Sequence, residues 1–139
     1  MITNYFQNLI RDTELHIGST NFPDEYYLGF STTVPNADGT GVNEPTEGSY
    51  TRVDVGDWEA DAQTAGKASN ENEILFPETT GSWGTLTNYV IFDALTGGNL
   101  LMANTLTVPR IMEQTEMQIK VNPGALSIII GDGVVDLQE

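Results

Sequence analysis

Acidic side chains are the groups of this sequence most able to do chemistry, since 20 of its 139 residues are Asp or Glu. Two carboxylates on either side of a sugar can hydrolyse a glycosidic bond. The acids that lie close together in the sequence are Asp57, Glu59 and Asp61, then Glu71 and Glu73, then Glu113 and Glu116. In so acidic a chain such pairs arise by chance, so a pair is no evidence of a catalytic site. A small carboxylate hydrolase stays an alternative that requires two acids in one pocket.

The single histidine, His16, is the other candidate acid or base. A histidine base needs an orienting partner and a nucleophile within reach. His16 lies near the expected end of a helix, where histidine commonly meets the last carbonyl groups, so we predict a structural role. The sequence has no cysteine, which excludes disulfides, zinc–thiolate sites and a cysteine nucleophile.

Cation and nucleotide sites are the next possibility. Asn36, Asp38 and Glu44 resemble a calcium loop, but the regular spacing of acids and the final glutamate of an EF-hand are missing. Asp57, Glu59 and Asp61 would share one face of a strand, which we expect to be solvated rather than cation-bound. The glycines at 96–98 and 131–133 form neither a dinucleotide nor a phosphate-binding motif. We therefore predict no metal and no cofactor.

The net charge of −15 bears on the partners. Phosphate backbones are bound by basic faces, and five basic residues cannot form one, so we expect no nucleic-acid partner. The longest apolar run, 126–130, has the length of a strand and not of a membrane span. The N-terminus lacks the basic and apolar regions of a signal peptide. We expect no membrane association.

The elements that must position any site are mainly β-strands. Residues 4–16 carry apolar residues at helical spacing and predict one short amphipathic helix. Alternating or apolar stretches predict strands at 25–33, 50–55, 73–77, 85–94, 99–106, 116–121 and 126–133, with an irregular strand near Trp58 and a tail at 134–139. Residues 34–49 read as a long loop. We predict an antiparallel β-sandwich of about eight strands, with 1–18 as an N-terminal helical arm and 19–139 as the sandwich domain.

The strongest local pattern is a hairpin at 85–106. Tyr89 and Ile91 occupy one face of its first strand, and Val90 and Phe92 occupy the other. A strand that is apolar on both faces is expected at the centre of a sheet. The aromatic residues at strand positions could stack on sugars, although we expect most of them in the core: Tyr26, Tyr27, Tyr50, Trp58, Trp83 and Tyr89.

Three motifs resemble a family of small bacteriophage structural proteins of the tail-fibre-like kind. The first is "LGFSTTVPNADGT", the second "EPTEGSYTRV", and the third "FPETTGSWGTLTNYVIFDALTGGNLL". The similarity covers nearly the whole chain. Two positions differ from the family. Glu47 stands where the family often has a small residue, and Leu86 stands where it usually has Val. Neither difference disturbs the pattern. The resemblance implies a virion component, made in the host cytoplasm, with no catalytic residues, on the capsid as a head-decoration protein or on the tail.

The resemblance also implies roles for matched residues. Tyr50, Trp83, Phe92, Gly97 and Gly98 are expected to determine the fold, the two aromatic residues Trp83 and Phe92 in the core and the glycines in turns. Pro45 is expected to shape the loop before Tyr50. Arg52 is expected to pair with a carboxylate, within the chain or across a subunit contact.

We expect the chain to act by burying surface against its neighbours. The predicted contact residues are Tyr5, Leu9 and Ile10 of the helix, Pro45 of the 34–49 loop, and Arg52, with the C-terminal tail as a further contact. The expected partners are major capsid or tail proteins and further copies of the chain, with a trimer as the first expectation. The alternative is a receptor-binding module that holds a host surface glycan on exposed tyrosines or Trp58.

Overall fold

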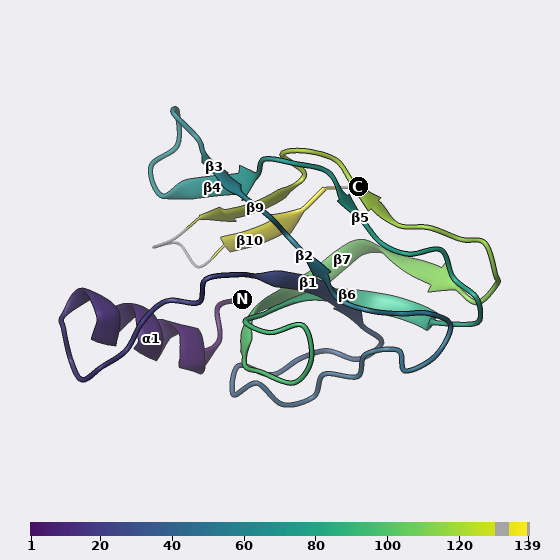
Figure 1. The fold of residues 1–139 in the computed structure, drawn as a ribbon, viewed down its shortest axis with the longest axis horizontal. Coiled ribbons are helices and arrows are strands. Elements are labelled where there is room, and N and C mark those ends of the chain that lie inside the picture. Colours follow the sequence, from purple (N-terminus) through teal and green to yellow (C-terminus); the bar gives the residue numbers. More distant parts are fainter. Residues whose placement is uncertain (130–133, 139) are drawn as a thin grey trace.

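Two antiparallel four-stranded sheets form the body of the protein in the computed structural model, which describes residues 1–129 and 134–138 (Figure 1). The elements are α1 (Asn4–Glu14), β1 (Tyr27–Ser31), β2 (Val53–Asp54), β3 (Trp58–Ala60), β4 (Lys67–Asn70), β5 (Ile74–Leu75), β6 (Gly84–Phe92), β7 (Leu100–Met112), β8 (Lys120–Val121), β9 (Leu126–Ile129) and β10 (Val134–Leu137). The predicted mainly β fold with antiparallel sheets and a short N-terminal helix is confirmed.

The first sheet has the order β2-β1-β6-β7 and contains the predicted hairpin. Strand β7 continues to Met112, past the predicted end at 106. Pro109 is tolerated within it because β7 is an edge strand, where a missing N–H breaks no ladder bond. The ladder with β6 is also irregular there, since the pairing shifts between Leu86 and Asn88.

The second sheet has the order β10-β9-β4-β3, and β5 pairs with β8 in a small two-stranded sheet. Strand β4 was not predicted, because its sequence KASN has no apolar alternation. The fully buried Asn70 holds it: its Nδ2 donates to the carbonyls of Asn72 (2.7 Å) and Asn122 (3.0 Å), and its Oδ1 accepts from the N–H of Leu126 (2.9 Å). The strand predicted at 116–121 is reduced to β8. The predictions for 130–133 and for Glu139 lie outside the described residues.

Strand β6 is buried on both faces, as the sequence predicts. Tyr89 and Ile91 belong to the main core between the sheets. Val90 and Phe92 face the opposite side and form a smaller apolar cluster with Leu100 and Ala103. The smaller cluster lies on the side of the sheet where the long loop runs, since Val42 of that loop packs against it.

The N-terminal residues are joined to the sheets. The Thr3 hydroxyl caps α1 by accepting from the N–H of Phe6 at 3.3 Å, and the N–H of Thr3 donates to the Leu101 carbonyl at 2.9 Å. Phe6 and Leu9 are buried in the main core, so α1 shares that core with both sheets. Among the described residues, no helix has the length and apolar character that a membrane crossing requires.

Candidate functional site: the Arg52 clamp and the surface it supports

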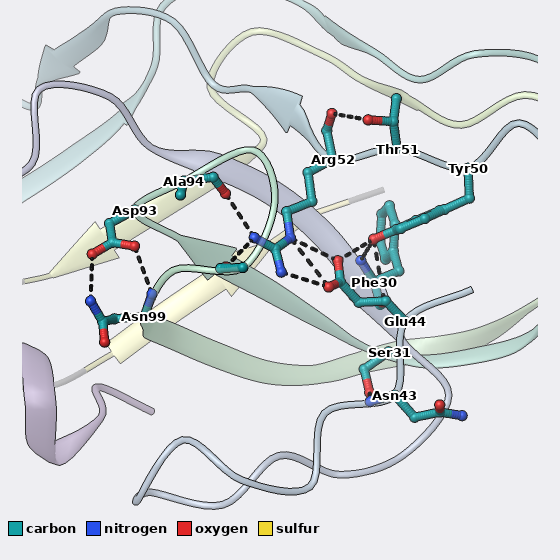
Figure 2. Close-up of polar contacts among 11 residues, drawn as sticks. Phe30, Ser31, Asn43, Glu44, Tyr50, Thr51, Arg52, Asp93, Ala94 and Asn99 are labelled. Atoms are coloured by element: carbon teal, nitrogen blue, oxygen red, sulfur yellow. Dashed lines mark hydrogen bonds and ion pairs between the residues drawn. The ribbon is translucent and has the colours of Figure 1, made fainter. Parts of the chain in front are cut away.

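Arg52 is the most heavily bonded side chain of the described residues around the long loop (Figure 2). Its Nη2 and Nε donate to the Glu44 carboxylate, with the shortest contact at 2.7 Å, and its Nη1 donates to the carbonyls of Ala94 and Gly97, both at 2.7 Å. Its Cζ lies 3.5 Å from the centre of the Phe92 ring. The side chain is only 8% exposed. The guanidinium thus fastens loop 34–49 to the turn that follows β6.

Tyr50 adds a second fastening. Its hydroxyl donates to Glu44 Oε1 at 2.8 Å and accepts from the N–H of Phe30 in β1 at 2.9 Å. Burial, followed by the nearby negative charge of Glu44, raises the pKa of the Tyr50 hydroxyl, so the group keeps its proton and can donate. We call Arg52, Glu44 and Tyr50, with the carbonyls of Ala94 and Gly97, the Arg52 clamp.

The Tyr50 ring is itself held by Trp83. The two rings meet edge to face, with centres 5.2 Å apart, and the Trp83 indole N–H donates to the Gly48 carbonyl at 2.8 Å. Gly48 has a φ of +68°, and a Cβ there would lie 2.7 Å from the Gly81 carbonyl oxygen. Only glycine fits this approach without strain.

Gly29 in the middle of β1 provides the space for the clamp. A Cβ on Gly29 would lie 2.6 Å from the Tyr50 hydroxyl and 2.8 Å from Glu44 Oε1. Gly29 was not predicted as a residue of the site. The signal was present, because a glycine inside a strand often marks a close approach of another group.

The turn gripped by Arg52 is closed by its own hydrogen bonds (Figure 2). The Asp93 carboxylate accepts from the backbone N–H of Asn99 at 2.7 Å and from its side-chain amide at 3.0 Å. Gly97 and Gly98 have φ angles of +62° and +73°. The carbonyls of Ala94 and Gly97 therefore point at Arg52 from a fixed turn.

Two open clefts border the loop segment 44–46 that the clamp holds. One, of about 260 Å³, is lined by the clamp and by Pro45, Thr46, Thr51, Leu95 and Thr96. The other, of about 270 Å³, carries hydroxyl, amide and carboxylate groups and is lined by Thr32, Asn43, Glu44, Pro45, Thr46, Glu47, Ser82, Trp83 and Gly84. We call Pro45, Thr46, Thr51, Leu95 and Thr96 the clamp surface.

The segments that build this region fall within a known family. The family described as podophage GP4 fiber I protein gp80 has a model that matches residues 1–129. This chain belongs to that family. Comparison with curated proteins gives no match. The resemblance drawn from the sequence motifs is confirmed, and membership in a podophage fibre family indicates a structural component of the phage particle.

The residues predicted to make subunit contacts occupy different environments in this fibre-family chain. Leu9 is buried in the chain's own core, and Ile10 packs partly against it. Tyr5 is 43% exposed, and Pro45 is half-buried at both clefts. Arg52 pairs with Glu44 of the same chain. Of the five, Tyr5, Ile10 and Pro45 thus keep accessible surface in the single chain.

The residues expected to determine the fold meet near the clamp. Trp83 is buried in the main core, and Phe92 lies in the smaller cluster beneath Arg52. Tyr50 belongs to the clamp, and Gly97 and Gly98 form its turn. Residues of the second and third sequence motifs therefore meet at the first sheet, with Trp83 in the main core and Phe92 in the cluster on the opposite face.

The candidate chemical groups lie apart from one another. His16 is exposed just beyond α1, with a φ of +54°. The side-chain hydroxyl of Thr40 donates to Asp38 and lowers the pKa of that carboxyl, within a turn closed by its own bonds. Asp61 follows β3 and accepts from the N–H of Gln63, which lowers its pKa. Within the described part of the chain, no three His, Asp or Glu residues gather as a metal site would require.

The aromatic candidates for sugar stacking separate into three environments. Tyr89 is buried, and its hydroxyl donates to the Val135 carbonyl at 2.8 Å. Tyr27 is bonded to Glu25. Tyr26 and Trp58 are half-buried and meet edge to face, with ring centres 6.0 Å apart. The last pair lines a separate apolar pocket.

Proposed function

We propose that the chain is a non-catalytic fibre subunit that binds its neighbours in the particle through the clamp surface. The observation that carries this proposal is the Arg52 clamp, which holds a long loop in one conformation through buried, charge-assisted bonds. A loop ordered before binding loses less conformational entropy when it binds. The clamp surface thus has the rigidity that a repeated structural contact needs.

The rest of the long loop is held in the same manner. The Asn43 carbonyl accepts from the N–H of Thr32 at 2.9 Å, and the Asn43 N–H donates to Ser31 Oγ at 3.0 Å. The Thr33 hydroxyl donates to the Gly41 carbonyl at 2.5 Å. These bonds tie the loop to the end of β1 along much of its length, which supports a preformed contact surface.

Charge favours this surface for contacts between copies. A chain with a net charge of −15 repels other copies of itself. The only two charged residues that line the first cleft, Glu44 and Arg52, neutralise each other. Copies of the chain can therefore meet there without placing like charges together. We propose a homo-oligomer, with a trimer as the first expectation, that also contacts other tail or capsid proteins.

The pKa values of two candidate carboxylates, Asp38 and Asp61, support a non-enzymatic role. A general acid in glycoside hydrolysis has a raised pKa, whereas the pKa values of Asp38 and Asp61 are lowered. Glu44, the acid of the clamp, has its two oxygens occupied by hydrogen bonds from Arg52 and Tyr50.

A charged substitution on the clamp surface tests the proposal. Thr46→Arg places a bulky cation on an exposed position beside Pro45, and Thr64→Arg makes the same change in the exposed turn between β3 and β4. We expect T46R to fold but to lose oligomer formation and incorporation into particles, while T64R retains both. Light scattering and the protein content of purified particles measure the two effects. Normal assembly of T46R would refute the proposed contact surface.

The second cleft favours one further candidate function, binding of a host surface glycan. Its hydroxyl, amide and carboxylate groups beside Trp83 are of the kinds that bind sugar hydroxyls. Calorimetry with host cell-surface polysaccharide tests this candidate. Ser82→Arg would abolish binding at this cleft and Trp58→Ala would abolish it at Trp58, and a polysaccharide that binds neither site refutes the candidate.

A further inference from the structure

A small apolar pocket lies where α1 and the two sheets meet, apart from the clamp surface. It has a volume of about 140 Å³ and is lined by Phe6, Tyr26, Trp58, Ala68, Met102 and Ile128. These residues come from α1, from the segment before β1, and from β3, β4, β7 and β9. The pocket is therefore shaped by elements that the core already fixes.

The lining determines the chemistry that the pocket accepts. None of its six side chains is charged. Among the described residues, neither the Tyr26 hydroxyl nor the Trp58 indole N–H has a hydrogen-bond partner, so two polar groups at most await a ligand. A sugar would bring several hydroxyls and leave most of them unpaired, which is costly away from water. A cavity of about 150 Å³ with apolar walls can hold a benzene ring. The pocket thus matches one apolar group of that size.

Charge near the pocket indicates which molecule carries that group. Glu25 adjoins Tyr26 in the chain, and Asp57 and Glu59 flank Trp58; all three acids are exposed. Lys67 lies next to Ala68 in the chain. Its Nζ is 3.6 Å from Asp61 Oδ2, so the charge of Asp61 offsets that of Lys67. Charges within a Debye length of about 8–10 Å act on an approaching partner. They favour a cationic segment and disfavour a second copy of this acidic chain.

We propose that this pocket receives one aromatic or branched aliphatic side chain from a positively charged segment of another protein. The inference rests on the proposed function only in that the chain has protein neighbours in the particle. It uses a different face from the clamp surface, so either can fail alone. Affinity comes from filling the pocket, and the acids around it select a basic partner.

Peptide binding to the purified full chain tests the proposal. The probes are the blocked peptide Lys-Lys-Phe-Lys-Lys and its versions with Ala in place of Phe or Glu in place of Lys. Tryptophan fluorescence and calorimetry report binding, with Trp58 at the pocket. We expect the Lys–Phe peptide to bind, the Ala and Glu versions to bind at least tenfold more weakly, and added salt to weaken binding.

Two matched variants locate the site. Ala68→Leu fills the pocket and is expected to lower the affinity for the Lys–Phe peptide at least tenfold. Ala62→Leu makes the same change at an exposed turn position and is expected to bind as the unaltered chain does. Circular dichroism and thermal unfolding of both variants verify that they fold.

Several outcomes would overturn the proposal. If no Lys–Phe binding occurs at millimolar peptide, or A68L binds it normally, the pocket does not take the side chain. Equal binding of the Phe and Ala peptides would reduce the interaction to charge alone. An oligomer that A68L dissociates would make a second copy the occupant, and polysaccharide binding lost in A68L would assign the pocket to a sugar. The T46R variant should still bind the peptide, which separates this test from that of the clamp surface.

Discussion

The Arg52 clamp and the apolar pocket beside α1 both bring together segments that are distant in the sequence. The clamp does so with polar groups and the pocket with apolar ones. The clamp brings polar groups together until each has a partner, and Gly29 leaves just enough room for them. The pocket brings apolar groups together and leaves about 140 Å³ unfilled. A satisfied polar cluster fixes the shape of its own chain, whereas an unfilled apolar site has affinity left for another molecule.

The clamp and the pocket should therefore respond differently to substitution. Removing one member of the clamp leaves the groups bonded to it without a hydrogen-bond partner, so substitutions in the clamp should destabilise the chain. Filling the pocket adds contacts, so the pocket should tolerate larger side chains.

Arg52→Ala should have the largest effect. It leaves the enclosed Glu44 carboxylate and the carbonyls of Ala94 and Gly97 without their donor, and removing one partner of a buried ion pair costs about 3 kcal/mol or more. Urea unfolding measures the loss. Arg11→Ala is the matched control, since the Arg11–Asp12 pair is exposed and such pairs contribute little. Equal, small effects of the two changes would contradict the role of the clamp.

Alkaline pH should have the second largest effect and lower the free energy of unfolding. Burial raises the pKa of Tyr50 and of Tyr89 above the usual value of about 10. Above that value the unfolded chain loses protons that the folded chain keeps, so the stability contributed by these groups is present at neutral pH and falls as pH rises. The slope approaches about 1.4 kcal/mol per pH unit for each tyrosine as the pH rises above about 10. Urea unfolding at pH 8 to 11 measures it, and Tyr50→Phe should make the slope shallower. Tyr89 and Tyr26, whose pKa values burial also raises, keep their contributions in that variant.

Gly29→Ala should displace the clamp without removing any of its members. The added Cβ would lie 2.6 Å from the Tyr50 hydroxyl, and overpacking of this kind costs about 1–3 kcal/mol. Gly81→Ala is the control, because the nearest atom to its Cβ would be Gly48 Cα at an ordinary 3.4 Å. Thermal unfolding compares the two variants. A Gly29→Ala chain as stable as Gly81→Ala would show that the clamp has more room than its geometry indicates.

Ala68→Leu should have the smallest effect and the opposite sign. Filling a pre-existing cavity commonly stabilises a protein by about 0.5–2 kcal/mol. We expect a slightly higher melting temperature, measured by calorimetry in the absence of any partner. A clear loss of stability would mean that the pocket is already tightly packed, and the contrast between the two regions would disappear.

Much of the fold could be predicted from the sequence because its signals are local. Spacing of Phe6 and Leu9 predicted the helix, and the alternation along β6 with the glycine turn predicted the hairpin. Strand β4 could not be predicted, since the long-range bonds of Asn70 hold it and its sequence carries no pattern. The extension of β7 past Pro109 was missed because the tolerance of proline depends on the edge position of the strand.

The site was less predictable for the same physical reason. A carboxylate partner for Arg52 could be expected in a chain with 20 acids, but nothing local distinguishes Glu44 from the others. The two carbonyls that Arg52 binds are backbone groups, which every residue has. The apolar pocket combines residues from six separate segments, so no spacing in the sequence could indicate it.

Electron cryomicroscopy of the intact phage particle, with this chain located in the map, would show whether the clamp surface is a contact between subunits. We predict that the clamp surface, with Pro45, Thr46 and Leu95, is buried against a neighbouring subunit, whether the density lies on the tail fibre or on the capsid. A map in which the clamp surface faces solvent in every copy would contradict the proposed contact. The clamp would then serve only to stabilise its own chain.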